Sequence, residues 1–326
     1  MYNNILITHN DLDGVGCSVI GKLLGFQWIF YASYNRGRYY ISQVLHDAIR
    51  CIPNVEWVYL TDISLSDLIW NEIEPDVKSM NVRLIDHHET SQNAELYKNN
   101  NFVKVDLDLD ISAAKLFYRL FEKDYPILHD YSDFIDAVSA YDTWHFEKSP
   151  IAKDLQRIFD CVAFQDPTYK YVKFADRLSK FSNMIINDPI TNERYPVWCE
   201  SCLDLYYKLS QPKMDYAVNK CISYFKDTAT VSYGAEDNIP LFELSWYFED
   251  NHPDIKNIIY VMTQKTGDVN VSIRTRYDDL DVSKIAEQFG GGGHQKAAAI
   301  SSVSAIDKYR VIDEVKRLLL EAEHTK

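Results

Sequence analysis

The sequence predicts an α/β fold whose N-terminal part is a doubly wound, mostly parallel sheet. A helical connector and a smaller C-terminal α/β domain with a mixed sheet are expected to follow it. Two observations carry this prediction. Short apolar runs alternate with helical segments over residues 1–145, as expected for a parallel sheet with helices on both faces. Near residue 227 the chain returns to short strands after a mainly helical stretch.

The elements of the first part follow one another at short intervals. Strands are predicted over residues 5–8, 27–32, 56–60, 82–85 and 102–105, and helices over residues 15–24, 40–49, from Ser64 or Ser66 to 73, and 113–121. Ser112 is a typical N-cap for the last of these helices. Functional groups in such sheets gather beyond the carboxyl ends of the strands, so polar residues at those ends are the first candidates for a site.

The second half of the chain has two different patterns. Residues 130–225 are rich in Tyr, Phe and Lys and are predicted to be helical. After them we expect strands over residues 228–233, 240–244, 257–264, 269–275 and 297–301, and helices over residues 282–289 and 306–322. These patterns predict a first domain over residues 1–147, a connector over 148–226 and a second domain over 227–326.

Composition and charge limit the class of function. A formal net charge of −14 disfavours a protein that coats long nucleic acid, because such binding needs many Lys and Arg contacts to phosphates. A small phosphorylated substrate and a carboxylate-rich metal site remain compatible with it. The sequence has no signal-peptide pattern, no apolar run of about 18 residues, and six scattered cysteines, so we expect a cytoplasmic protein without a membrane segment. The lone CxxC of Cys199 and Cys202 is interpreted as structural.

Side chains that bind metal ions follow three of the predicted strands. They are His9, Asp11 and Asp13 after the first strand, Asp62 after the third, and Asp86, His87 and His88 after the fourth, with Asp142 at the end of a later helix. Gly14 would let the backbone turn sharply into the next helix. Each cluster alone could be a turn, a helix cap or a solvated pair. Together they could hold two metal ions about 3.5–4 Å apart, a recurring arrangement for attack on phosphorus, and the mix of imidazole and carboxylate suits manganese, iron or zinc.

A run of glycines marks a second candidate site. It consists of Gly290, Gly291, Gly292 and Gly293, followed by His294. Ordering four glycines is entropically costly, which is sensible where backbone amides must approach a phosphate closely. Arg274 and Arg276 end the preceding strand, where alternation would point both to one face and let them pair with a phosphate. The alternative interpretation is a flexible linker with two surface arginines.

Taken together, these motifs resemble those of the DHH phosphoesterase family with its associated C-terminal domain. The matching positions are Asp11-x-Asp13-Gly14, Asp62, the triplet Asp86-His87-His88, Asp142, and Gly290–His294 with Ala297 and Ala298. Two positions depart from the pattern. In many relatives the first histidine lies four residues before the first aspartate, whereas His9 lies two before Asp11. The C-terminal signature usually ends Ala-Ala-Gly, and here Ala299 stands in the place of the glycine.

The resemblance implies a role for each residue. The implied ligands of two manganese ions, for which magnesium, cobalt or iron could substitute, are His9, Asp11, Asp13, Asp62, His87 and Asp142, with Asp62 bridging. Asp86 would orient an imidazole and His88 would face the substrate phosphate, so both would act in catalysis beside Asp62 and His87. The implied substrate-binding residues are His88, Arg274, Arg276, Gly291, Gly292, Gly293 and His294.

The spacing His-Asn-Asp-Leu-Asp-Gly, with Tyr-Asp-Thr-Trp later, most resembles the oligoribonuclease (nanoRNase) branch. This implies attack by a metal-bridging hydroxide on short RNA or DNA oligonucleotides, with release of mononucleotides. Three alternatives keep the chemistry: a phosphatase on 3′-phosphoadenosine 5′-phosphate, a phosphodiesterase on cyclic or linear dinucleotides, and a RecJ-like exonuclease on single-stranded DNA. A non-catalytic nucleotide sensor would be expected to have lost a ligand, and all six positions are kept. A homodimer is left open.

Overall fold

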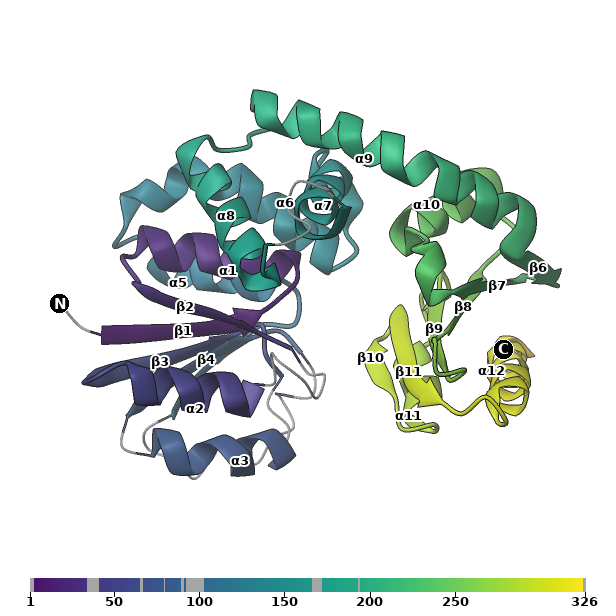
Figure 1. The fold of residues 1–326 in the computed structure, drawn as a ribbon, viewed down its shortest axis with the longest axis horizontal. Helices are drawn as coiled ribbons and strands as arrows, with labels where there is room; N and C mark the ends of the chain where they lie inside the picture. The colour runs from purple at the N-terminus through teal and green to yellow at the C-terminus, as the bar shows by residue number, and fades with distance from the viewer. Residues whose placement is uncertain are drawn as a thin grey trace. The chain divides into compact units, whose positions relative to one another are not determined.

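The chain forms two compact units, Met1–Tyr206 and Tyr207–Lys326, and each is described by itself (Figure 1). The computed structural model describes residues 3–33, 41–64, 67–78, 80–88, 91, 103–165, 172–192 and 194–324. The two units meet within helix α9 (Val197–Tyr216), so residues 148–206 of the expected connector belong to the first unit. The three-part division of the chain stays a prediction.

The first unit is built on a five-stranded sheet of order β2-β1-β3-β4-β5. Its strands are β1 (Asn3–His9), β2 (Trp28–Ala32), β3 (Val55–Thr61), β4 (Asn81–Asp86) and β5 (Val103–Leu107). All four pairings are parallel, so the carboxyl ends of the strands lie at one edge. This confirms the predicted parallel sheet. Tyr40, Ser66 and Phe102, which the predicted elements included, lie outside the described residues.

Helices cover both faces of this sheet. They are α1 (Leu12–Leu23), α2 (Ile41–Cys51), α3 (Asp67–Val77), α5 (Ala113–Phe121), α6 (Ser132–Asp142), α7 (Ala152–Asp160) and α8 (Phe174–Asn187). Helices α2 and α3 pack on one face, and α1, α5, α6 and α8 lie on the other (Figure 1). The strands are buried from both sides because their side chains alternate: Ile5 and Ile7 pack toward α2 and α3, whereas Leu6 packs toward α1. The doubly wound prediction is confirmed.

The second unit contains a six-stranded mixed sheet of order β10-β11-β9-β8-β7-β6. Its strands are β6 (Ile222–Phe225), β7 (Thr228–Gly234), β8 (Asn257–Thr263), β9 (Val269–Thr275), β10 (Gly292–His294) and β11 (Ala297–Val303). Only the β7–β8 pair is parallel within this sheet as described. Helices α11 (Val282–Glu287) and α12 (Lys308–His324) cover one face, and α10 (Leu241–Asn251) packs on β7 and β8 at the other face.

One predicted strand is wrong, and two strands were missed. Residues 240–244 were expected to be extended, but the helix α10 begins at Leu241. The apolar run there is too short to separate a period of two from one of 3.6, and the core positions Leu244 and Phe248 lie four residues apart. Strand β6 lies in the stretch expected to be helical, and β10 consists of the last two glycines of the run and His294.

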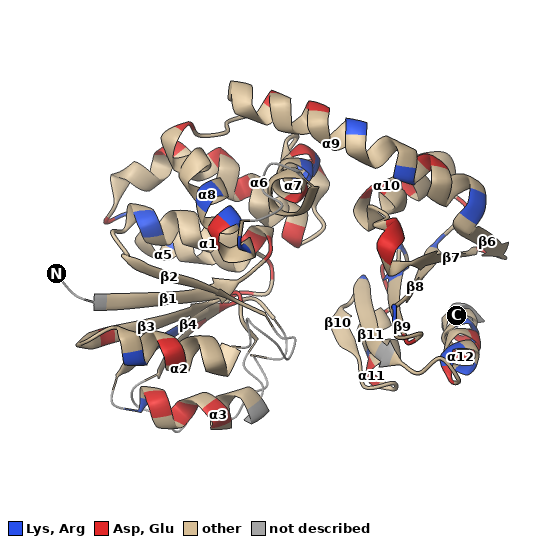
Figure 2. Ribbon diagram, viewed as in Figure 1, with Lys and Arg blue, Asp and Glu red and all other residues tan. Residues whose placement is uncertain are grey.

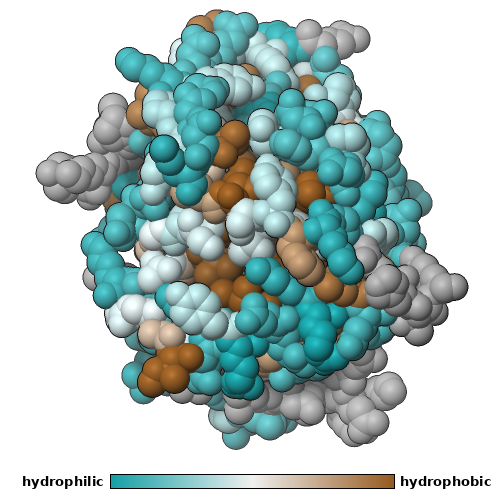
Figure 3. Space-filling model, turned by 90° about the vertical axis from the view of Figure 1, so that its right-hand side faces the viewer, coloured by the Kyte–Doolittle hydropathy of each residue, from teal (hydrophilic) through white to brown (hydrophobic). Residues whose placement is uncertain are grey.

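Charged residues of both signs lie along α9 and α12 (Figure 2). The face drawn in Figure 3 is mostly hydrophilic and carries a group of hydrophobic side chains among hydrophilic ones. Within the described ranges, no helix has the length and hydropathy that a bilayer crossing requires.

Candidate metal centre

The carboxyl edge of the first sheet collects the polar residues singled out from the sequence. His9 ends β1, Asp62 directly follows β3, and Asp86 ends β4. These three strands are parallel neighbours in the sheet. The side chains therefore come from adjacent strand ends, although about 77 residues separate the first from the last of them in the chain. Asp11 precedes α1, Asp13 lies in its first turn, and Asp142 is the last residue of α6.

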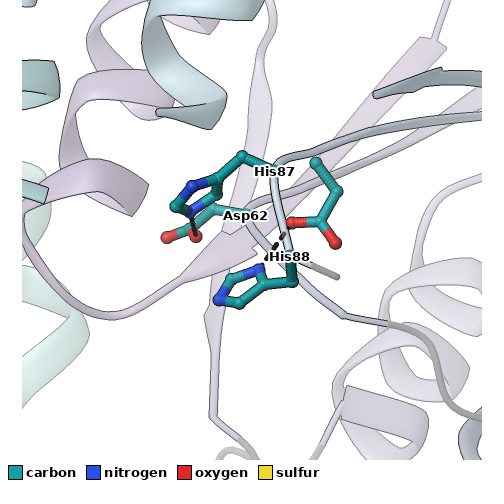
Figure 4. Close-up of side chains that lie close together, drawn as sticks. Asp62, His87 and His88 are labelled. Atoms are coloured by element: carbon teal, nitrogen blue, oxygen red, sulfur yellow. Dashed lines mark hydrogen bonds and ion pairs between the residues drawn. The ribbon is translucent and has the colours of Figure 1, made fainter. Parts of the chain in front are cut away.

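Asp62 lies at the centre of the cluster. Its Oδ1 is 3.5 Å from Nε2 of His87, and its Oδ2 is 3.8 Å from Nδ1 of His9. Nε2 of His87 is also 3.1 Å from Oδ2 of Asp142. The Asp62 carboxylate is 2% exposed, and its Oδ2 accepts no hydrogen bond within the part of the chain that the structure describes. Figure 4 shows the His87 ring directed at the Asp62 carboxylate. A buried, under-satisfied carboxylate oxygen of this kind calls for a partner.

Three groups of side chains each offer ligand atoms within 4.8 Å of one another. The groups are His9, Asp11 and Asp62; Asp13, His87 and Asp142; and Asp62, Asp86, His87 and His88. Asp62 and His87 each belong to two groups. Overlapping ligand sets of this kind suit two metal ions that share a carboxylate.

Gly14 determines how close α1 begins to the end of β1. A Cβ at this position would lie 1.9 Å from the carbonyl oxygen of His9, so the approach requires glycine. Asp11 caps the same helix: its Oδ1 accepts the N–H of Gly14 at 3.0 Å, and its Oδ2 lies 2.7 Å from Nδ1 of His9. The cap and the close turn therefore hold the His9–Asp11 pair in a fixed orientation.

Asp62 has a left-handed backbone with φ of +55°. This conformation costs about 1 kcal/mol or more for a residue other than glycine, although aspartate tolerates it better than most. Its N–H donates to the carbonyl of Ile85 at 3.0 Å, which fixes it against β4. Strain at a buried carboxylate is typical of positions kept for a functional reason.

Asp13 has a structural role that the sequence did not reveal. Its Oδ2 accepts the N–H of Ala113 at 2.9 Å and its Oδ1 accepts the N–H of Ala114 at 3.1 Å. Asp13 thus ties the start of α1 to the first turn of α5, where a carboxylate also interacts favourably with the helix dipole. Both oxygens keep a second lone-pair direction, so this role does not exclude metal binding.

The buried carboxylates repel one another. Burial raises the pKa of Asp62 well above its ordinary value, and the charges of Asp11 and Asp13 raise it further. Burial and the charge of Asp142 likewise raise the pKa of Asp13. Burial acts in the same direction on Asp11, but the charge and hydrogen bond of His9 outweigh it and hold the pKa of Asp11 below its usual range. A cation placed among these groups would favour their charged forms, so the donor set fits a divalent transition metal.

Asp86 and His88 form a separate pair at the end of β4. Oδ1 of Asp86 is 2.7 Å from Nδ1 of His88, and its Oδ2 accepts the hydroxyl of Ser91 at 2.5 Å. Burial alone would lower the pKa of His88, but the hydrogen bond and charge of Asp86 raise it above its ordinary value. In Figure 4 the His88 ring is paired with a carboxylate other than that of Asp62. Asp86 therefore orients the His88 ring and stabilises its protonated form relative to a free imidazole.

In the second unit, the sheet register aligns Arg274 with His294. Arg274 pairs with Ala297 across β9 and β11, and Ala297 pairs with His294 across β11 and β10. Directly paired residues point to the same face, so a cation and an imidazole flank a small side chain. The next row on this face, Ser272, Ala299 and Gly292, also consists of small residues. We call these six residues the small-residue face.

The backbone around the four glycines shows why glycine stands at three of these positions. Gly290 follows α11 with φ of +75°. A Cβ on Gly291 would lie 2.1 Å from the carbonyl oxygen of Ala299, and one on Gly293 would lie 2.4 Å from that of Ala297. A Cβ on Gly292 would meet none of the described atoms within 4 Å. Gly292 and Gly293 therefore belong to the edge strand β10 rather than to a linker. Only Gly292 lacks a structural reason within the described part of the unit.

Arg276 is not part of the Arg274–Ala297–His294 row. Strand β9 ends at Thr275, so the predicted alternation does not extend to it. Its Nη2 donates to the carbonyl of His252 at 2.8 Å, beyond the end of α10. The structure thus places Arg274 and His294 on one face of the sheet and directs Arg276 to a backbone carbonyl.

Comparison with known sequences covers both units. Residues 249–321 match the DHHA1 domain. The chain is also 27% identical to oligoribonuclease NrnB of Bacillus subtilis over 312 residues, which is 91% of this chain and 72% of that protein. The predicted resemblance to the DHH family with its C-terminal domain is confirmed.

Solved structures of other proteins share the fold of this chain. A pGpG-specific phosphodiesterase, PggH of Vibrio cholerae, superposes with a TM-score of 0.60 at 15% identity and covers 98% of this chain and 99% of its own. RecJ of Thermus thermophilus in complex with Mn²⁺ gives a TM-score of 0.58 at 12% identity, over 96% of this chain and 52% of its own. At these identities the matches establish the fold.

Proposed function

We propose that this chain is a metal-dependent phosphodiesterase that hydrolyses short oligonucleotides to mononucleotides. The observation that carries the proposal is the set of overlapping ligand groups sharing Asp62 and His87 at the carboxyl edge of a parallel sheet. The similarity to an oligoribonuclease along most of the chain supports the same reaction class.

The proposed cofactor is a pair of manganese ions, for which magnesium, cobalt or iron could substitute. The residues that would hold them are His9, Asp11, Asp13, Asp62, His87 and Asp142, and Asp62 belongs to two of the ligand groups. When bound, such ions supply Lewis-acid chemistry at phosphorus and neutralise the charge on phosphate oxygens. The raised pKa values of Asp13 and Asp62 favour a cation at this position.

His88 is proposed to bind the phosphate that is cleaved. Asp86 holds Nδ1 of the ring at 2.7 Å and raises its pKa. In the protonated form of the ring, both nitrogens are donors. A protonated imidazole can donate to a phosphate oxygen and stabilise the charge that develops there. Asp86 acts through His88 and is a positioning residue.

The small-residue face is proposed to bind the rest of the substrate. Arg274 can pair with a phosphate in a bidentate way, and His294 lies in the same row across Ala297. The absence of a side chain at Gly292, and the backbone of Gly291 and Gly293, would let a ligand approach closely. Arg276 belongs to the proposed set only if it exchanges its bond to His252 for a phosphate.

A panel of RNA and DNA substrates from two to twenty nucleotides, with manganese, tests the proposal. We expect mononucleotide release to be fastest from the shortest substrates and to stop when a chelator removes the metal. No release from any of them, or release only from long single-stranded DNA, would contradict it.

A second candidate function is hydrolysis of linear dinucleotides alone. The specific observation in favour is the mutual coverage of 98% and 99% with a pGpG-specific phosphodiesterase. Comparing dinucleotides with three- to seven-nucleotide substrates separates the two candidates, because only a dinucleotide enzyme would leave the longer ones intact.

Cytoplasmic location and a homodimer stay predictions. Light scattering of the purified protein would check whether it is a dimer.

A further inference from the structure

Helix α6 ends with a tryptophan where glycine is usual. The N–H of His145 donates to the carbonyl of Ala140 at 2.8 Å, and the N–H of Trp144 donates to that of Tyr141 at 3.1 Å. These two bonds form a Schellman motif, whose left-handed position is most often glycine and sometimes asparagine. Here that position is Trp144, with φ of +60°.

A bulky residue in this conformation is an outlier. The other non-glycine residues with positive φ in the described chain are Asn54, Asp62, Lys226 and Asn238. Asparagine and aspartate tolerate the left-handed region, and Lys226 lies in the tight turn between β6 and β7. Trp144 is the aromatic member of the set. Because the backbone would favour glycine, the indole is kept for something that its side chain does.

Trp144 follows the end of α6, the helix whose last residue is the proposed ligand Asp142. Trp144 follows Asp142 by two residues, and Oδ2 of Asp142 is 3.1 Å from Nε2 of His87. The Trp144 ring makes an edge contact with Phe146, at 5.7 Å between centroids and 66°, and Phe146 in turn contacts Tyr141. These contacts hold the ring in place, while the side chain is 36% exposed.

We propose that Trp144 is a stacking surface for a nucleobase of the substrate. This inference rests on the proposed function and specifies its substrate class: the ester bound at the metal centre carries a base beside the scissile phosphate, rather than being a pyrophosphate or polyphosphate. Aromatic rings stack on every base, so the residue selects nucleotides without selecting their sequence. Together with the phosphate contacts proposed above, it would position the nucleotide that is released.

A packing role for Trp144 has to be separated from stacking. Leucine keeps an apolar side chain and the same left-handed strain but has no ring, whereas phenylalanine keeps a ring. Trp28 supplies a matched control. It is 41% exposed, in the same unit, and begins β2 at the amino edge of the sheet, opposite to the edge that carries the metal centre.

The experiment measures KM and kcat with saturating manganese for a dinucleotide and for an analogue that lacks one base. For Trp144→Leu we expect KM for the dinucleotide to rise about tenfold, the size of a lost base–aromatic stack, while kcat and the KM for the abasic analogue stay unchanged. Trp144→Phe should restore most of the affinity, and Trp28→Leu should change neither substrate.

Two outcomes overturn the inference. One is an unchanged KM for the dinucleotide in Trp144→Leu, and the other is an equal loss on both substrates together with a lower Tm, which would make the residue structural. If the wild-type chain hydrolyses none of the nucleotide substrates, the proposed function is refuted instead. In that case calorimetric binding of the dinucleotide still decides the stacking, because the same tenfold difference in affinity is expected.

Discussion

The two candidate surfaces of this protein are built in opposite ways. At the carboxyl edge of the first sheet, five aspartates and three histidines are crowded together, and burial with mutual repulsion raises the pKa of Asp13 and Asp62. On the small-residue face of the second unit, side chains are reduced to Gly, Ala and Ser around one arginine and one histidine.

The difference indicates what each surface needs from its ligand. The first is electrostatically unfavourable as it stands, so a bound cation should stabilise the fold as well as act in the reaction. The small-residue face carries no comparable cluster of like charges among its six residues, so substitutions at His294 or Gly292 should weaken substrate binding while leaving the stability of the ligand-free protein nearly unchanged. Variants in the two surfaces should therefore differ in how activity and stability respond.

The largest effect is expected for Asp62→Asn. The amide has the same shape and tolerates the left-handed backbone, but it removes the central negative charge. We expect activity to fall by about a thousandfold or more, since metal catalysis contributes several kcal/mol. The Tm of the metal-free protein should rise, because one of the mutually repelling carboxylates is gone. More than about a tenth of the wild-type rate in manganese would contradict the role of Asp62 in metal catalysis.

Asp13→Ala is the contrasting variant within the same cluster. It also removes a buried carboxylate, but that carboxylate accepts two amides at the start of α5. We expect the metal-free Tm to fall, because unpaired buried amides cost about 1–3 kcal/mol each. Thermal unfolding in a chelator measures this. Equal shifts for the Asp13 and Asp62 variants would show that repulsion, not hydrogen bonding, dominates at both.

On the small-residue face, His294→Ala should lower the efficiency of dinucleotide cleavage by about tenfold to a hundredfold, the range of a charge-assisted hydrogen bond. The bound metal and the Tm should not change, because His294 lies outside the ligand cluster and is exposed on an edge strand. Cleavage of an activated phosphodiester that makes few contacts is the control. Loss of metal, or equal loss on both substrates, would move His294 into the catalytic centre.

A smaller effect is expected at Gly292. A methyl group there meets no described protein atom within 4 Å, so Gly292→Ala should leave the Tm unchanged and raise KM only several-fold. Gly293→Ala is the matched variant, because a Cβ would lie 2.4 Å from the carbonyl of Ala297 and φ is +145°. It should lower the Tm. A lower Tm for both would assign the whole glycine run to folding.

The smallest effect is a pH dependence of stability in the metal-free protein. A carboxyl whose pKa is raised on folding stabilises the fold below its unfolded pKa, and that contribution is lost as pH rises through the folded value. Asp13 and Asp62 are of this kind. The metal-free Tm should therefore be higher near about pH 5 than near about pH 8. Asp62→Asn should reduce the difference, and an opposite slope would refute the repulsion at this cluster.

Local signals predicted much of the fold. The strand ends that carry His9, Asp62 and Asp86 were found because buried parallel strands are continuous apolar runs followed by polar residues. Helix α5 was predicted with its observed bounds because Ser112 is a strong N-cap, and its side chain accepts the N–H of Lys115. Helix α10 was mistaken for a strand because its first apolar residues are too few to show a period.

What the sequence could not reveal depends on register and on distant partners. The backbone amides that donate hydrogen bonds to Asp13 lie 100 and 101 positions away in the chain, and no local pattern marks them. The row of Arg274, Ala297 and His294 follows only from the pairing of three strands. The divergence of Arg276 follows from where β9 ends. Trp144 was noted only as part of the Tyr-Asp-Thr-Trp motif. Its left-handed backbone had no signal, because that conformation is expected at Gly or Asn rather than at tryptophan.

The central claim is that the cluster around Asp62 holds two metal ions, and counting them tests it most directly. Manganese is titrated calorimetrically into the chelator-treated full chain, and the metal retained after dialysis is measured. We predict two ions per wild-type chain, fewer in Asp62→Asn, and two in His294→Ala. Binding of no manganese, or the same number in wild type and Asp62→Asn, would contradict the account.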